Sequence, residues 1–235
     1  MKVEELSRYG KPLRMPKEAV KKQDKIVMGI LKEEFGRLGL VPFYVTLLNE
    51  RRKIQREFPD TMKKVDEFGK DTRTEFLMFS SMFRVLIRRM GRENAYEFLK
   101  DIMQAIAPIS MPAIYQLDEL LHCEGDTFEN FKKYNIAMFK AIHEEGTWIN
   151  DLIEDEKDKL TIRVTSCANV DLFGEVGYPE LAKLGCDHDL AGYPLIEEDV
   201  CCDFRRLCTI AKGDDFCLFE FYRRGTAPDN AHLNR

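Results

Sequence analysis

The spacing of apolar residues changes near residue 155, and this change constrains the fold more than any other feature of the chain. Before it, apolar residues recur every three or four positions, as in amphipathic helices. After it, Leu160, Ile162 and Val164 alternate with polar residues, which predicts a strand. We therefore expect an α+β fold, in which a helical N-terminal region is followed by a small antiparallel sheet with short helices.

Six helices are predicted in the first region from this periodicity and from the residues that begin or end helices. The clearest of them carries Phe76, Phe79 and Phe83 on one face and ends at Gly91. Proline sets two other boundaries, because the residue before a proline is disfavoured in a helix. The expected helices cover residues 17–38, 43–58, 72–90, 92–106, 113–121 and 127–145.

Three strands and one short helix are predicted in the second region. The strands cover residues 160–167, 204–211 and 216–224, and Gly213-Asp214 is expected to turn the last two into a hairpin. The short helix covers residues 178–185. A charged, solvated link at residues 154–159 is expected to join the two regions.

The expected organisation is a helical region over residues 1–155 and a C-terminal α+β unit over residues 156–225. Trp148, the single tryptophan, is expected to be a packing anchor at the junction between them. Residues 226–235 are expected to form a loose tail, which argues against a catalytic role for His232.

Charge and hydropathy narrow the class of protein. The formal net charge of the 235-residue chain is -5, so it lacks the basic surface that favours nucleic acid binding. No apolar run approaches the ~20 residues that span a bilayer. The first residues, MKVEELSRYG, lack the apolar stretch of a secretory signal. We expect a cytoplasmic protein that binds a small molecule rather than nucleic acid or a membrane, and a homo-oligomer stays open.

Cysteine is concentrated in one segment: five of the seven cysteines lie in residues 185–217, GCDHDLAGYPLIEEDVCCDFRRLCTIAKGDDFC. The count is odd, no CxxC pair occurs, and cytoplasmic thiols stay reduced, so a disulfide framework is not expected. Buried core cysteines are one alternative. A tetrahedral zinc site is another, with His188 or an aspartate as a substitute ligand. Its candidate cysteines are Cys167, Cys186, Cys208 and Cys217.

A catalytic pocket is the third alternative, and it centres on Cys186-Asp187-His188-Asp189. A thiol beside a base or a positive charge is a nucleophile at neutral pH, and a carboxylate can serve as the base. If the segment is extended, Cys186 and His188 share one side, and Asp187 and Asp189 share the other. Arg206 offers a guanidinium fork for a substrate carboxylate.

Three segments, read in order, resemble the L-2-amino-thiazoline-4-carboxylic acid hydrolase family: SCANVDLFGEVGYPEL, GCDHD and DFRRLCTIAKGDDFCLFEF. The resemblance is good over about the last 60 to 70 residues. One position departs from the family pattern, because Leu218 stands where an aspartate is expected after Cys217. The matching positions are Cys167, Pro179-Glu180-Leu181, Cys186 with Asp189, Arg206, Thr209-Ile210-Ala211 with Gly213, and Cys217.

The resemblance implies a hydrolase that opens a small cyclic amidine at a carbon–nitrogen bond, with no cofactor. The type substrate is a five-membered thiazoline that carries an amino group and a carboxylate, and the type product is N-carbamoyl-cysteine. Cys186 or Cys167 is expected to act as the nucleophile, or to activate water. Asp189 is expected to hold the amidine and move protons, and Arg206 to bind the carboxylate. Cys217 and His188 are expected in the substrate pocket.

Two other functions stay open at this point. The C-terminal sheet with its cysteines also resembles the small-molecule sensing domain of the 4-vinyl reductase type, in which cysteines hold zinc and nothing is turned over. The hydrolase fold can also serve another ring-modifying step in a biosynthetic pathway, because a fold does not fix a substrate.

Overall fold

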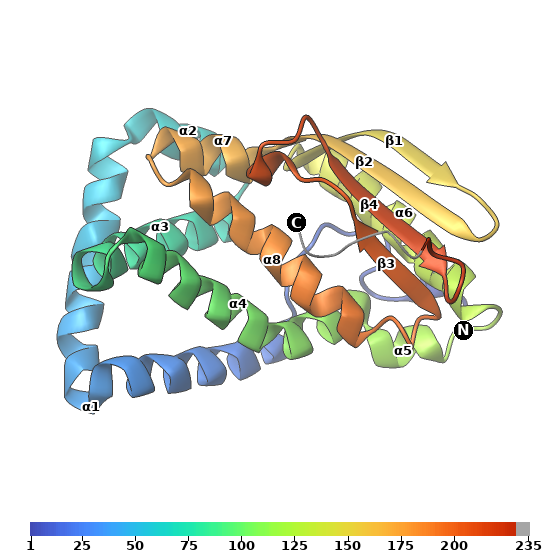
Figure 1. Ribbon diagram of the computed structural model, residues 1–235, viewed down its shortest axis with the longest axis horizontal. Helices are drawn as coiled ribbons and strands as arrows, with labels where there is room; N and C mark the ends of the chain where they lie inside the picture. Colours follow the sequence, from blue (N-terminus) through green and yellow to red (C-terminus); the bar gives the residue numbers. More distant parts are fainter. Residues whose placement is uncertain (229–235) are drawn as a thin grey trace.

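The computed structural model describes residues 1–228 and confirms the α+β fold, with helices first and an antiparallel sheet near the C-terminus (Figure 1). The predicted tail, with His232, lies mostly outside the described residues. The helices are α1 (Lys17–Glu57), α2 (Pro59–Glu67), α3 (Lys70–Met90), α4 (Arg92–Tyr115), α5 (Leu117–Leu121), α6 (Thr127–Glu145), α7 (Ala168–Glu175) and α8 (Lys183–Gly192). The strands are β1 (Trp148–Asp155), β2 (Lys159–Cys167), β3 (Cys202–Arg206) and β4 (Cys217–Arg223). Short 3-10 turns are η1 (Val3–Glu5), η2 (Pro179–Ala182), η3 (Tyr193–Leu195) and η4 (Ile210–Lys212).

Glycine makes the sharp joints between the first helices. Gly36 interrupts α1 with φ 68° and ψ 162°, so α1 consists of two helices, and Pro42 lies within the second. The break falls just before the predicted gap between residues 38 and 43. Gly91 joins α3 to α4 with nearly the same angles, φ 84° and ψ 166°. This region of backbone space is essentially restricted to glycine, which explains why each helix stops there.

Helix α4 corrects the sequence prediction, because it continues through Pro108 and Pro112 to Tyr115. The predicted end at Ile106 is therefore wrong. The helix predicted over residues 113–121 is present only from Leu117 to Leu121, as α5. Each proline removes one backbone hydrogen bond, but packing against α8 holds the helix together. The contact is close: a Cβ atom on Gly192 of α8 would lie 2.3 Å from Met111 Cγ of α4.

The sheet has four antiparallel strands in the order β1-β2-β4-β3. Strand β1 was not predicted, because its sequence WINDLIED mixes charged and apolar residues without a clear alternation. The predicted link at 154–159 is in fact the end of β1, the turn, and the first residue of β2. The pairing aligns Trp148 with Cys167, so both lie at the end of the β1–β2 pair from which α7 begins.

The predicted β3–β4 hairpin is confirmed by the pairing of Arg206 with Phe219, but the predicted strand over 204–211 is wrong after Arg206. The chain leaves the sheet there and forms η4. Asp214 Oδ2 accepts the backbone N–H of Thr209 at 2.7 Å, and Cys217 Sγ accepts that of Ile210 at 3.3 Å. These local bonds replace the strand hydrogen bonds that the alternating sequence predicted.

Two apolar clusters fill the interior. One lies between the sheet and α6, where Phe131 and Phe139 pack edge-on against Phe221 and Phe219. The other gathers α1 to α4 with α7 and η2. Figure 1 shows α8 running between the helices and the sheet, so this helix borders both halves of the molecule. The division of the chain into domains at residue 155 stays a prediction.

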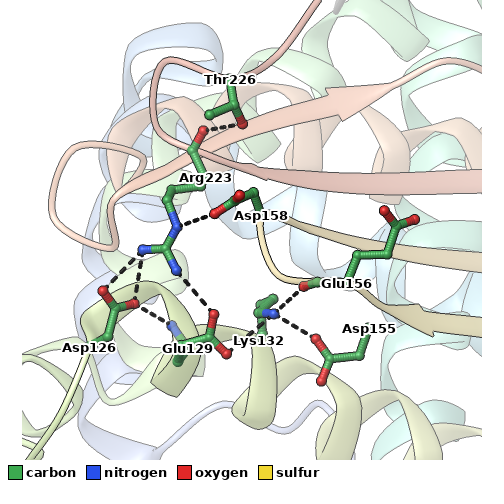
Figure 2. A network of polar contacts seen from close by, with 8 residues as sticks. All are labelled: Asp126, Glu129, Lys132, Asp155, Glu156, Asp158, Arg223 and Thr226. Carbon is green, nitrogen blue, oxygen red and sulfur yellow. Dashed lines mark hydrogen bonds and ion pairs between the residues drawn. The ribbon is translucent and has the colours of Figure 1, made fainter.

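A polar network ties the far end of the sheet to α6 (Figure 2). Arg223 of β4 contacts Asp158 in the β1–β2 turn at 2.8 Å, Asp126 at 3.0 Å and Glu129 at 3.0 Å. The buried Lys132 of α6 donates to Asp155 Oδ1 at 2.6 Å. The network fixes the β1–β2 hairpin over α6.

No helix within residues 1–228 has both the length and the apolar character of a transmembrane span.

The joint at Gly91 provides a test of the fold. We expect Gly91→Ala to lower the free energy of unfolding by about 1–3 kcal/mol, because alanine cannot adopt this backbone conformation without strain. No atom lies within 4 Å of the added Cβ, so the cost comes from the backbone alone. Chemical denaturation measures the difference.

The matched control is Gly174→Ala in α7. This glycine is also free of contacts within 4 Å, but it has helical geometry. We expect the control to be neutral or to stabilise the protein by up to about 1 kcal/mol. Equal stabilities of the two variants would contradict the assigned joint.

Candidate functional site

A cavity of about 320 Å³ lies between the sheet and helices α3, α4, α6 and α8. All six residues predicted for the site line this one cavity, although they come from four elements. They are Cys167 at the end of β2, Cys186, His188 and Asp189 on α8, Arg206 at the end of β3, and Cys217 at the start of β4. Their catalytic and binding roles stay predictions.

The Cys186–Asp189 segment is helical, not extended, and this changes which side chains share a face. Cys186 and Asp189 are three residues apart, so they lie one above the other on α8. The same nitrogen, Arg206 Nη2, lies 3.9 Å from Cys186 Sγ and 4.0 Å from Asp189 Oδ2. Asp187 points away and accepts a hydrogen bond from Tyr96 of α4. The predicted pairing of Asp187 with Asp189 is therefore wrong.

Two arginines within residues 1–228 line the cavity, and of these only Arg206 has a buried side chain. Its side chain is 4% exposed, and the guanidinium carbon lies 3.4 Å from the centre of the Phe219 ring. Nε and Nη1 have no hydrogen-bond partner. A buried guanidinium normally forms hydrogen bonds with a carboxylate. The nearest carboxylate oxygen to Arg206 is that of Asp189, at 4.0 Å, so the charge of Arg206 is only partly balanced.

The three thiols of the cavity are held in the neutral form. Burial raises the pKa of Cys186 and of Cys217, and the nearby Arg206 opposes the rise in both. Burial raises the pKa of Cys167 to about 11, even though Cys167 is the N-cap of α7 and faces the backbone N–H groups of Val170 and Asn169. Cys186 is the thiol in contact with Arg206, and it is therefore the best placed to become a thiolate.

The adjacent residues His188 and Asp189 have shifted pKa values, and both shifts favour the neutral form of the side chain. Burial lowers the pKa of His188 to about 4, and its Nε2 contacts Ser110 Oγ of α4. Burial raises the pKa of Asp189 to about 6, and Arg206 opposes this rise. A carboxylate that titrates near neutral pH is suited to accept and return a proton.

Sequence reasoning missed several residues of the cavity. Ser110 contacts His188 from the part of α4 between Pro108 and Pro112, which lies outside the predicted helices. Tyr115 and Tyr193 share a hydroxyl hydrogen bond of 2.8 Å, and Trp148 lines the cavity from β1. No local signal marks this continuation of α4, because a proline inside a helix normally ends or kinks it.

The departure at Leu218 falls on the other side of β4 from the cavity. Cys217 and Phe219 line the cavity, and Leu218 between them does not. Its backbone N–H donates to the carbonyl of Cys208 at 3.2 Å. The missing aspartate therefore removes no carboxylate from the cavity wall.

The zinc alternative lacks its ligand set in this part of the chain. Among residues 1–228, no group of three or more histidine, cysteine, aspartate or glutamate side chains is arranged to hold a metal ion. All seven cysteines lie in this range and all are free thiols. The tetrahedral site considered for Cys167, Cys186, Cys208 and Cys217 is therefore not formed.

Comparison with known proteins gives one decisive match. Residues 71–221 match the L-2-amino-thiazoline-4-carboxylic acid hydrolase family, which is more than half of the chain. The protein belongs to this family. The matched range contains all six cavity residues named from the sequence, and it begins near the start of α3. No curated protein and no solved structure gives a significant match.

Family membership confirms the resemblance inferred from the C-terminal motifs and extends it into the helical part of the chain. The family name implies a hydrolase. Within the family's range, the elements that carry the cavity are α3, α4, α6, α8 and the sheet.

The opposite pKa shifts of His188 and Asp189 can be tested by measuring how the free energy of unfolding depends on pH. The pKa of His188 is lowered from 6.5 to about 4, so its contribution to stability is present above pH 6.5 and is lost as the pH falls toward 4. The pKa of Asp189 is raised from 3.8 to about 6, so its contribution is present below pH 3.8 and is lost as the pH rises through 6. The two effects oppose each other between about pH 4 and 6.

Single variants should separate the two effects. Relative to wild type, the free energy of unfolding of His188→Asn should fall as the pH rises from 4 to 6.5, and that of Asp189→Asn should rise. Each change is about 2–3 kcal/mol over this window, because one pKa unit corresponds to about 1.4 kcal/mol. Urea denaturation at several pH values measures both slopes. Parallel pH dependence in the three proteins would show that neither group is shifted.

Proposed function

We propose that the protein hydrolyses a small cyclic amidine that carries a carboxylate, of which 2-amino-thiazoline-4-carboxylate is the type. In this proposal Arg206 binds the carboxylate, Cys186 attacks the amidine carbon and Asp189 moves the proton. Family membership supports the reaction class, and the grouping of these three side chains around one cavity supports the roles.

One observation carries the proposal: the charge of the buried Arg206 is incompletely balanced. Its nearest carboxylate oxygen is 4.0 Å away, and the ring of Phe219 covers one face of the guanidinium. Burying a cation is costly unless an anion accompanies it. A substrate carboxylate in the cavity would supply that anion, so binding a carboxylate is favoured over binding a neutral ring.

The geometry also supports a proton path between Cys186 and Asp189, because both lie within about 4 Å of Arg206 Nη2 on one face of α8. Asp189 takes the thiol proton as Cys186 Sγ bonds to the amidine carbon. The ring bond to that carbon then breaks, and the leaving atom receives the proton. Water next attacks the same carbon, the carbamoyl product forms, and Cys186 leaves as a thiol.

The carbamoyl product identifies the bond that breaks. N-carbamoyl-cysteine keeps both nitrogens on the former amidine carbon and has a free thiol. In the thiazoline ring the carbon–sulfur bond is therefore cleaved, and the expectation of carbon–nitrogen cleavage does not fit this substrate. The leaving group is a thiolate, which needs less proton assistance than an amide nitrogen, because its pKa is near 8.5.

Direct assay tests the proposal. Purified protein is incubated with 2-amino-thiazoline-4-carboxylate, and N-carbamoyl-cysteine is measured by chromatography with mass detection. We expect Cys186→Ser to lose at least a hundredfold in kcat, because a serine hydroxyl is a much weaker nucleophile. Cys167→Ser should keep activity within about tenfold, and Cys201→Ser, at an exposed position, is the control for thiol removal.

Two outcomes would overturn the roles. Full turnover by Cys186→Ser excludes it as the nucleophile, and loss of activity in Cys167→Ser alone would assign that role to Cys167. Absence of turnover by folded wild-type protein rejects this substrate.

Arg206→Gln should raise KM more than tenfold with a smaller effect on kcat, because it removes the partner of the substrate carboxylate.

The pH dependence of kcat/KM gives an independent test. Asp189 must be ionised to accept the thiol proton, and burial raises its pKa to about 6. The rate should therefore rise with pH and level off above about pH 7. Asp189→Asn should lower kcat/KM and abolish this limb. An unchanged limb in Asp189→Asn would assign the titration to another group.

A further inference from the structure

We propose that the substrate carries an apolar substituent, several carbons long or aromatic, which packs against the wall of the cavity formed by α3, α4 and the segment before α1. This inference rests on the proposed function, since it assumes that Arg206 binds the carboxylate end of the same molecule. It identifies a second subsite and a substrate class larger than the thiazoline carboxylate itself.

The size of the cavity is the first argument. A five-membered ring with one amino group and one carboxylate fills on the order of 120 Å³, about four times the volume of one liquid water molecule. The cavity measures about 320 Å³, so the ring alone would leave more than half of it unfilled. A cavity of this size is at the lower end of the range that holds larger ligands with most of their surface buried.

The composition of the second wall is the next argument. The candidate catalytic groups come from α8 and the sheet, whereas α3, α4 and residues 13–15 contribute mostly apolar side chains. Their polar residues in the lining are Arg14, Glu75, Ser110 and Tyr115. The apolar set is Leu13, Met15, Met78, Phe79, Met103 and Ile106. A wall in which apolar side chains predominate favours a hydrocarbon group over a polar one, because burying apolar surface is favourable.

Methionine is over-represented in this cavity. Five of the ten methionines of the chain line it, namely Met15, Met78, Met103, Met111 and Met138. Methionine side chains are flexible and polarizable, so they adapt to apolar ligands of different shape. Leu13 and Met78 are also 37% and 39% exposed to solvent, so a ligand can cover apolar surface on both side chains.

The segment that carries Leu13 and Met15 is held in place, so it can form part of a binding wall. Between these residues, Arg14 forms an ion pair with Glu145 of α6 at 2.8 Å and approaches Asp71 of α3 at 3.8 Å. The side chains of Arg14 and Asp71 are more than half exposed. This polar rim marks where the apolar wall meets solvent.

Binding of product analogues tests the inference without turnover. N-carbamoyl-glycine, N-carbamoyl-alanine, N-carbamoyl-norvaline, N-carbamoyl-norleucine and N-carbamoyl-phenylalanine share the carboxylate and carbamoyl groups and differ in apolar size. Trp148, the only tryptophan, lines the cavity, so its fluorescence reports binding. We expect the Kd to fall about three- to fourfold for each added methylene, the factor for complete burial of that group.

Variants separate the two ends of the ligand. Met78→Gln keeps the length of the side chain but makes it polar, so it should weaken the norleucine and phenylalanine derivatives about tenfold and leave the glycine derivative unchanged. Met90→Gln, at the end of the same helix and outside the cavity, is the matched control and should change no Kd. Arg206→Gln should weaken the whole series in parallel.

The outcomes distinguish this inference from the proposed function. A Kd that does not change along the wild-type series overturns the apolar subsite, even if 2-amino-thiazoline-4-carboxylate is hydrolysed. A falling Kd without hydrolysis of that compound supports the subsite and rejects the type substrate. If the thiazoline is turned over, its 5-alkyl derivatives should show kcat/KM at least tenfold higher, and a lower value contradicts the inference.

Discussion

The buried guanidinium of Arg206 is the constraint on which the site depends. It is covered by the ring of Phe219 on one side and shares a single nitrogen between Cys186 and Asp189, each about 4 Å away. Its positive charge opposes the effect of burial on both groups, and thereby keeps the thiol and the carboxylate closer to their ionised forms. Without this cation, burial alone would act on Cys186 and Asp189 and would favour their neutral forms more strongly.

Two packing events place this cation. The pairing of β3 with β4 sets Arg206 opposite Phe219, at the point where β3 leaves the sheet. Helix α8 then lies against α4, and the absence of a side chain at Gly192 allows the close approach to Met111. The helical turn from Cys186 to Asp189 consequently faces the end of β3. The polar network around Arg223 holds the opposite end of the sheet on α6, so the sheet is fixed at both ends.

Much of the site could be predicted from the sequence, because its chemistry lies in residue types. Cys186, Asp189 and Arg206 were selected as a nucleophile, a base and a carboxylate partner, and they line one cavity. What failed was local geometry. Local patterns do not predict the helix around His188, the continuation of α4 beyond its first proline, or strand β1. In each case contacts with distant residues outweigh the local preference on which the prediction was based.

The sequence by itself determined the α+β class, the helix end at Gly91 and the family of the protein. Periodicity, glycine and motif residues act over a few neighbouring positions, so local patterns reveal them. Only the tertiary structure decided that Arg206 meets Cys186 and Asp189, and that methionines from α3 and α4 complete their cavity. Such contacts join residues far apart in the chain. They depend on strand register and helix packing, which local sequence patterns do not encode.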